Sequence, residues 1–113
     1  MKDDRVYLEH ILECIRRIED YTKDGRDAFL ASYLIQDGTL RNFQTMAEAT
    51  QRLSQKLKEG HPAVDWRAIS GFRNVLVHDY LGIDIEDVYK IIEIDLPGLK
   101  TVAESLLQEL GNN

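Results

Sequence analysis

Residues 71–80 read Gly-Phe-Arg-Asn-Val-Leu-Val-His-Asp-Tyr, which places a strong cation, a proton-transfer group and a phenol within eight residues. From Trp66 onward the larger side chains recur every three or four residues, and this spacing predicts one amphipathic helix over about Asp65–Leu81. With about 100° of rotation per residue, Arg73 and Tyr80 lie on nearly the same line of that helix. Arg73 therefore occupies a position where an apolar core residue is expected.

An arginine on the apolar side of a helix needs an explanation. Burying a guanidinium without partners costs several kcal/mol, on the order of what breaking a buried ion pair costs. Either Arg73 is paired inside the fold, for which Glu48 is the candidate partner, or it faces a polar cleft. Both alternatives point to a site at this helix.

Length and composition limit the class of protein. The chain has 113 residues, enough for one domain over 1–113 that buries roughly two-thirds of its unfolded surface. No run of 18 apolar residues predicts a membrane span. The start, Met1–Arg5, has no apolar signal core, and Cys14 is the single cysteine. These features lead us to expect a cytoplasmic protein.

The net charge limits the classes of partner that we expect for this chain. A formal net charge of −6 argues against a general nucleic-acid binder, which would carry a basic face. It leaves room for an enzyme that touches a few phosphates with a local cluster. The cations concentrate in the middle of the chain, whereas the sequence from Ile83 onward is acidic.

The remaining sequence predicts helices and no strand. Asp37-Gly38 lies inside the second predicted helix and could kink it or break it in two, and the sequence leaves both open. Antiparallel helices with short loops form an up-and-down bundle, so we expect an all-α fold of four to five helices. The predicted helices span about Asp4–Lys23, Arg26–Lys58, Asp65–Leu81, Asp84–Asp95 and Pro97–Leu110, with a fraying tail at 111–113.

Arg73 and His78 together suggest a reaction. An arginine fork suits a phosphate or a phosphorane, and histidine moves protons near neutral pH. The pair suffices for metal-free RNA cleavage, in which the 2′-hydroxyl attacks the adjacent phosphorus. One chain supplies one histidine in the motif, whereas such cleavage benefits from both a base and an acid, so a two-fold dimer would supply both. The alternative is structural: His78 favoured by a helix C-terminus, beside an Arg73 paired to Glu48.

Metal and cofactor sites are not predicted. The sequence has no Gly-rich phosphate loop and no Asp-x-Asp pair that would hold magnesium. His10 and Cys14 are four residues apart, but two ligands make a poor metal site.

The sequence also resembles a known family. Arg73-Asn74, three residues and His78 match the Arg-x4–6-His motif of the HEPN superfamily. The extension to Tyr80 is similar to the form found in HepT-like ribonuclease toxins. The similarity covers nearly the whole chain, because residues 40–49, 66–74 and 83–99 resemble the family's helix signatures. Tyr89 and Ala47 depart from it, where tryptophan and glycine are frequent, and neither touches the chemistry.

The resemblance implies an all-α HEPN homodimer that acts as a metal-independent endoribonuclease. It implies a toxin paired with a minimal nucleotidyltransferase antitoxin, with RNA as substrate and no cofactor. By position, Arg73 and His78 are the implied catalytic pair, Asn74 supports them, and Tyr80 is the residue that receives AMP. Arg41 and Glu48 match signature positions, as supporting residues. A competing hypothesis is a non-catalytic HEPN module that binds only a nucleotide or a protein.

Overall fold

A computed structural model describes residues 3–111 of the chain. Over these residues it contains seven α-helices, one 3-10 turn and no strand, so the predicted all-α class is confirmed. No helix among them is long and apolar enough to cross a membrane. The elements are α1 (Asp4–Tyr21), α2 (Arg26–Ala31), α3 (Tyr33–Arg52), α4 (Gln55–Glu59), α5 (Trp66–His78), η1 (Tyr80–Gly82), α6 (Ile85–Ile94) and α7 (Leu96–Gly111).

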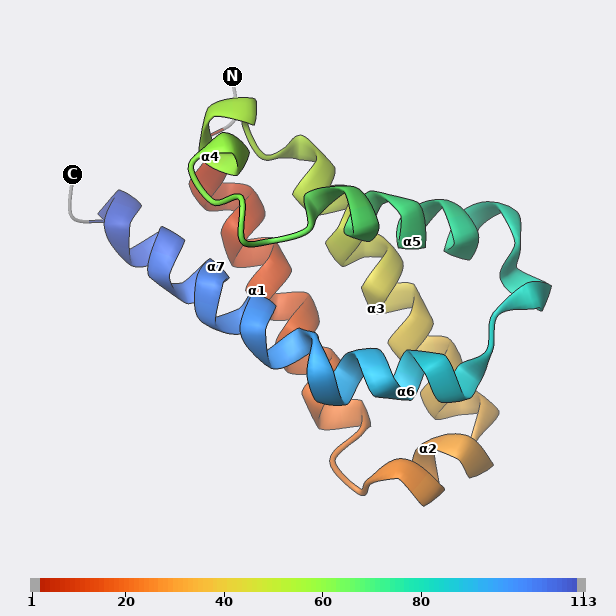
Figure 1. Cartoon of the computed structure of the whole chain (residues 1–113). Helices are drawn as coiled ribbons and strands as arrows, with labels where there is room; N and C mark the ends of the chain where they lie inside the picture. Colours follow the sequence, from red (N-terminus) through yellow and green to blue (C-terminus); the bar gives the residue numbers. More distant parts are fainter. Residues whose placement is uncertain (1–2, 112–113) are drawn as a thin grey trace.

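The bundle is built around α1 and α3, which run in opposite directions along one another (Figure 1). α7 packs along α1, and α5 packs along α3 on another side of the pair. At the right-hand end of Figure 1, η1 turns the chain from α5 back into α6. The first turn of α1 and the last turn of α7 lie at the same end, where the Arg5 guanidinium donates to the Leu110 carbonyl at 2.9 Å.

The core follows the apolar stripes of the sequence. On α1 the buried residues repeat every three or four positions, as an amphipathic helix requires. Phe29 of α2 is fully buried and its ring lies 5.3 Å from that of Tyr89 on α6. Phe43 of α3 meets Phe72 of α5 edge to face at 5.4 Å, so an aromatic pair joins the site-bearing helix to the core.

The second predicted helix is three helices, with breaks that differ from the predicted one. Gly38 does not break α3, which continues from Tyr33 to Arg52; the Tyr21 ring packs over it, and an added Cβ would lie 3.2 Å from that ring. The first break falls at Ser32, whose hydroxyl accepts from the Ile35 amide and caps α3. The second falls at Leu53, where the backbone is extended, and Ser54 caps α4 in the same way.

The third predicted helix ends three residues early. Asp65 is the predicted N-cap and accepts from the Ala68 amide at 2.9 Å. The helix stops at His78 because Asp79 leaves the helical region at φ −139° and ψ 47°. Tyr80 is therefore not on α5, and the prediction that it continues the helical line of Arg73 was wrong. The Asp79 carboxylate fills the place where a side chain at Gly82 would stand, 2.7 Å from an added Cβ.

The C-terminal elements agree with the sequence. Asp84 caps α6, because its carboxylate accepts from the Glu86 amide at 2.9 Å. Pro97 sits in the first turn of α7, where a missing amide proton costs nothing. Of the predicted tail, Gly111 belongs to α7, and residues 112–113 lie outside the described part of the chain.

Replacing Phe43 with alanine should lower the free energy of unfolding by about 3–5 kcal/mol. Phe43 is buried and its ring holds Phe72, so the loss combines transfer energy and a cavity between α3 and α5. Denaturant unfolding followed by circular dichroism measures it. Leu34→Ala on the same helix, where the side chain is 83% exposed, is the control and should change the value little. Equal losses in both variants would contradict this packing.

Candidate active site

Arg73 lies on α5 and points to α3. Its Nη2 donates to Glu48 Oε2 at 3.4 Å, and its Nη1 donates to Asn74 Oδ1 at 3.3 Å. The side chain is 27% exposed and that of Glu48 38%. Such a half-exposed ion pair is worth about 1 kcal/mol at most, so it makes Arg73 tolerable without locking it in place.

The guanidinium also keeps an unused donor. Arg73 Nε is buried and has no hydrogen-bond partner among the described residues. Buried donors are nearly always paired, and one that is not marks a place where a ligand or water completes the site. The exposed part of the fork, rather than this buried nitrogen, can bind a phosphate through planar charge-assisted hydrogen bonds.

His78 is the last residue of α5 and is exposed. Within residues 3–111, nothing lies at hydrogen-bond distance from its imidazole. It follows Arg73 by five positions, so the two side chains leave the helix about 140° apart. Arg73 and His78 of one chain therefore do not converge on a single point.

Beneath the end of α5, α3 presents a polar stripe. Its members, Asp37, Arg41, Gln44 and Glu48, follow a 4-3-4 spacing and so share one side of the helix. Glu48, at one end, holds Arg73. Asp37, at the other end, makes the second polar contact of the site, with Tyr80. Arg41 lies between these contacts, is exposed, and forms no side-chain hydrogen bond or ion pair with a described residue.

The Tyr80 hydroxyl donates to Asp37 Oδ1 at 3.0 Å, which fastens η1 to the first turns of α3. The ring is 45% exposed. Desolvation, then the hydrogen bond to Asp37 and the charge of that carboxylate, raise the pKa of Tyr80 above its ordinary value of 10.0. The phenol thus stays protonated at neutral pH, with its proton directed at a carboxylate.

This contact has a testable pH dependence. Because the pKa of Tyr80 is raised on folding, the stability from its contact with Asp37 is complete below pH 10.0 and is lost as pH rises through the shifted value. The phenolate absorbance difference between wild type and Tyr80→Phe should report a pKa above 10.0, and Asp37→Asn should move it down. A Tyr80 that ionises at or below pH 10.0 in the folded protein would contradict the contact.

The two polar contacts are well separated. Asp37 and Glu48 are eleven residues apart on α3, which corresponds to roughly 16 Å along the helix. Arg73 and Tyr80, which the sequence places on nearly the same line, therefore contact opposite ends of the polar stripe. The nearest cation on the stripe is instead Arg41, one turn from Asp37.

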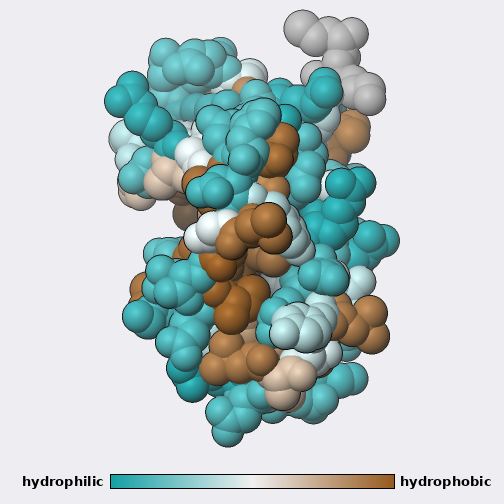
Figure 2. Space-filling view, turned by 90° about the vertical axis from the view of Figure 1, so that its right-hand side faces the viewer, coloured by the Kyte–Doolittle hydropathy of each residue, from teal (hydrophilic) through white to brown (hydrophobic). Residues whose placement is uncertain are grey.

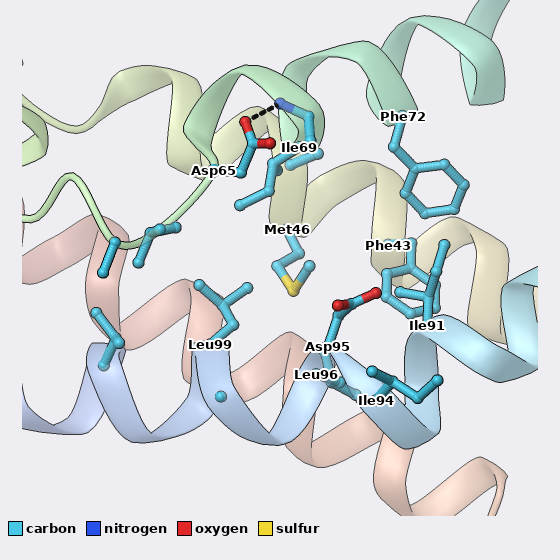
Figure 3. Close-up of a pocket in the computed structure, with 16 residues that line it drawn as sticks. Phe43, Met46, Asp65, Ile69, Phe72, Ile91, Ile94, Asp95, Leu96 and Leu99 are labelled. Carbon is cyan, nitrogen blue, oxygen red and sulfur yellow. Dashed lines mark hydrogen bonds between the residues drawn. The ribbon is translucent and has the colours of Figure 1, made fainter.

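An apolar groove lies apart from these polar contacts. The groove, of about 550 Å³, runs between α5 and the α6–α7 segment, with α3 as its floor. Figure 3 shows side chains of α5 and α7 on opposite sides of it. None of the six site residues predicted from the sequence lines the groove. Its apolar lining includes Phe43, Met46, Ile69, Phe72, Ile91 and Leu99.

The end of the molecule that carries His78 exposes apolar side chains. Figure 2 faces this end, where α5 meets η1 and α6, and apolar surface crosses its middle. In this part of the chain Val75, Val77 and Leu81 are 39%, 38% and 99% exposed. Exposed apolar side chains near one end of a molecule are typical of a protein–protein contact.

The titratable side chains of the described residues form no metal-binding cluster. No group of three or more His, Cys, Asp or Glu side chains in residues 3–111 is arranged to hold a metal ion. Cys14 is buried, 3.8 Å from His10 and 3.5 Å from the Thr45 hydroxyl. Desolvation raises the pKa of the Cys14 thiol, against smaller lowering effects of Thr45 and Arg17.

The structure thus brings Arg73 together with Glu48 and Asn74, and leaves His78, Tyr80 and Arg41 apart from that cluster. Sequence reasoning missed Asp37. The signal was present in the 4-3-4 polar stripe of α3, but Asp37 was interpreted there only as a neighbour of a helix-breaking glycine.

Comparison with known proteins gives a consistent result. A family model described as Ribonuclease HepT-like matches residues 11–106. The chain is 34% identical, over 99% of its length, to a Methanocaldococcus jannaschii protein whose name joins a gamma-glutamylcyclotransferase with a candidate RNase. It spans about half of that protein, 51%.

Two other relatives match nearly end to end. A Thermococcus cleftensis protein named "Probable ribonuclease HepT" is 33% identical over 88% of this chain and 92% of its own. A Caldanaerobacter subterraneus subsp. tengcongensis protein, named as a candidate RNase, is 31% identical over 96% of this chain and 98% of its own. No solved structure matches the chain.

Proposed function

The chain belongs to the HepT-like ribonuclease family, and from that premise we propose that it is a metal-independent endoribonuclease. The proposal rests on the contacts and the exposure of the Arg73 side chain. Its guanidinium is held by one half-exposed carboxylate and the side chain is 27% exposed, which leaves part of the fork open to a phosphate. His78 stands on the same helix, exposed and unpaired among the described residues.

In the proposed reaction the 2′-hydroxyl of RNA attacks the neighbouring phosphorus. A histidine removes the hydroxyl proton, and a second proton is delivered to the departing 5′-oxygen. Arg73 stabilises the charge that develops on the phosphorane oxygens. Asn74 accepts from Arg73 Nη1 and Glu48 from Nη2, so these two residues orient the fork.

The proposal requires a second copy of the chain. Arg73 and His78 of one chain diverge by about 140° on α5, and one chain offers one histidine at this end. A two-fold dimer that covers the exposed Val77 and Leu81 would bring the His78 ends of two chains together. The cleft would then hold Arg73 and His78 from both chains.

Light scattering at micromolar concentration should therefore give twice the 13.0 kDa mass of the chain. A double replacement, Val77→Lys with Leu81→Lys, should convert the protein to monomer and abolish cleavage, because buried lysines oppose association. The control is Val6→Lys, an exposed apolar residue on the first turn of α1 at the end that carries Leu110, which should leave the dimer intact. A wild-type species of 13.0 kDa would refute the two-fold site.

We further propose that the chain is the toxin of a toxin–antitoxin pair. Its partner would be a minimal nucleotidyltransferase that transfers AMP from ATP to Tyr80 and so silences cleavage. The accessible half of the Tyr80 ring, at an exposed turn directly after His78, supports this assignment.

The second candidate is a non-catalytic module that binds a nucleotide or a protein. The net charge of −6 and the apolar groove favour it. Incubating the purified protein with RNA in the presence of a chelator separates the two functions. Cleavage that His78→Ala abolishes supports the enzyme, and intact RNA supports the binding module.

A further inference from the structure

The contact at Asp37 holds the groups that a phosphoryl or nucleotidyl acceptor needs. The Tyr80 Oη lies 3.0 Å from a carboxylate oxygen, with the proton directed at it, and 45% of the residue is open to solvent. In the kinases, an aspartate in this relation to a substrate hydroxyl accepts its proton as the new bond to phosphorus forms. Tyr80 and Asp37 have the same relation within one chain.

A cation stands beside this pair. Arg41 follows Asp37 by one turn on the same side of α3, where residues four apart are neighbours at the helix surface. It is exposed and takes no part in an ion pair with a described residue. Its fork is therefore free to bind phosphate oxygens next to the Tyr80 hydroxyl.

From this arrangement we infer that Tyr80, Asp37 and Arg41 form one modification site, in which Asp37 accepts the phenolic proton and Arg41 holds the incoming α-phosphate. The inference deepens the proposed function, on which it rests for the regulatory role of Tyr80. It assigns part of the transfer chemistry to the modified protein itself, where the nucleotidyltransferase would otherwise supply all of it.

The covalent step transfers the nucleotidyl group from the donor to the Tyr80 oxygen. The Tyr80 Oη–P bond forms as its proton passes to the Asp37 carboxylate, and the bond from α-phosphorus to the leaving group breaks. With ATP the leaving group is pyrophosphate, and with a phosphorimidazolide it is imidazole, which takes up one proton from solvent as it leaves. The Asp37 carboxyl then returns its proton to solvent.

The AMP adduct explains how Tyr80, which does not contact Arg73, can block RNA cleavage. A phosphodiester on Oη has no proton to donate, so the hydrogen bond that fastens η1 to α3 is lost. Its negative charge lies beside the Asp37 carboxylate, and like charges at this distance repel. The turn that directly follows His78 is thereby released from α3, while the nucleoside occupies the surface there.

The test uses adenosine 5′-phosphorimidazolide, a chemical AMP donor, so no partner enzyme is needed. Purified protein is treated at pH 7, and mass spectrometry follows adduct formation on each tyrosine peptide. Tyr33 is the internal reference, because it is 84% exposed and its hydroxyl has no described partner. We expect Tyr80 to react at least about tenfold faster than Tyr33, as general-base assistance would give.

Single replacements of Asp37 and of Arg41 separate the roles of these two residues. Asp37→Asn keeps an acceptor oxygen for Tyr80 but is not a base, so the rate at Tyr80 should fall to that of Tyr33. Arg41→Gln should raise the donor concentration needed for half-maximal rate, and Arg52→Gln, the same change three turns along α3, should not. Equal rates at Tyr80 and Tyr33 in wild type, or an unchanged rate in Asp37→Asn, would overturn the inference.

RNA cleavage by the same wild-type preparation is measured in parallel. A protein that is modified selectively at Tyr80 but does not cleave RNA would sink the proposed function and leave the modification site standing. Cleavage of RNA without selective modification of Tyr80 would support the proposed function and overturn the modification site.

Discussion

Replacing His78 with alanine should lower the rate of RNA cleavage by about two to four orders of magnitude. His78 is the only histidine on α5, and its imidazole is exposed at the helix end, so its removal takes away the proposed proton-transfer group. Because the side chain is exposed, its removal should leave the unfolding temperature nearly unchanged. Initial rates on a short RNA, measured at matched protein concentration, give the value.

The matched control is His10→Ala, which removes another exposed histidine from α1. It should cleave at the wild-type rate. Arg73→Ala should lose about two to three orders of magnitude, the typical loss for a donor to a developing oxyanion. Arg73→Lys should recover only part of this, since it restores charge without the fork. Full activity in His78→Ala from a contaminant-free preparation would rule out the mechanism.

Complete attachment of AMP to Tyr80 should silence cleavage to the level of the His78→Ala protein. The adduct adds a negative phosphodiester and a nucleoside at the exposed turn after His78, and it removes the hydrogen bond that fastens that turn to Asp37. Co-expression with a cognate nucleotidyltransferase, followed by mass spectrometry and a cleavage assay, measures modification and silencing together.

Tyr80→Phe separates modification from catalysis. It should cleave RNA and resist silencing, because its ring still packs while its hydroxyl is absent. Tyr33→Phe, on the exposed start of α3, should be silenced like wild type. An adduct on a different residue, or silencing of Tyr80→Phe equal to wild type, would show that the regulatory residue is another one.

The predictions from sequence succeeded where local interactions decide the structure. The caps at Asp65 and Asp84 depend on an amide two or three residues away, and both are present. The Arg73–Glu48 pair is one of the two alternatives that an arginine on an apolar stripe left open, and it is present.

The predictions from sequence failed where a helix break depends on contacts with residues distant in the sequence. Asp37-Gly38 has the composition of a helix break, but the Tyr21 ring packs on Gly38 and α3 continues through it. The helix pattern past His78 also continues in the sequence as far as Leu81. There the contact of Tyr80 with Asp37, 43 residues earlier, accompanies a tighter 3-10 turn. No local pattern reports a contact over that separation.

The proposed function rests on one reaction, the cleavage of RNA by 2′-hydroxyl transesterification without a metal ion. Its most direct test is the chemical identity of the RNA ends after incubation in excess EDTA, determined by mass spectrometry of the fragments. The proposal predicts fragments with 2′,3′-cyclic phosphate ends from wild type and none from His78→Ala. Intact RNA in EDTA, with cleavage restored by magnesium and unaffected by the His78 replacement, would contradict it.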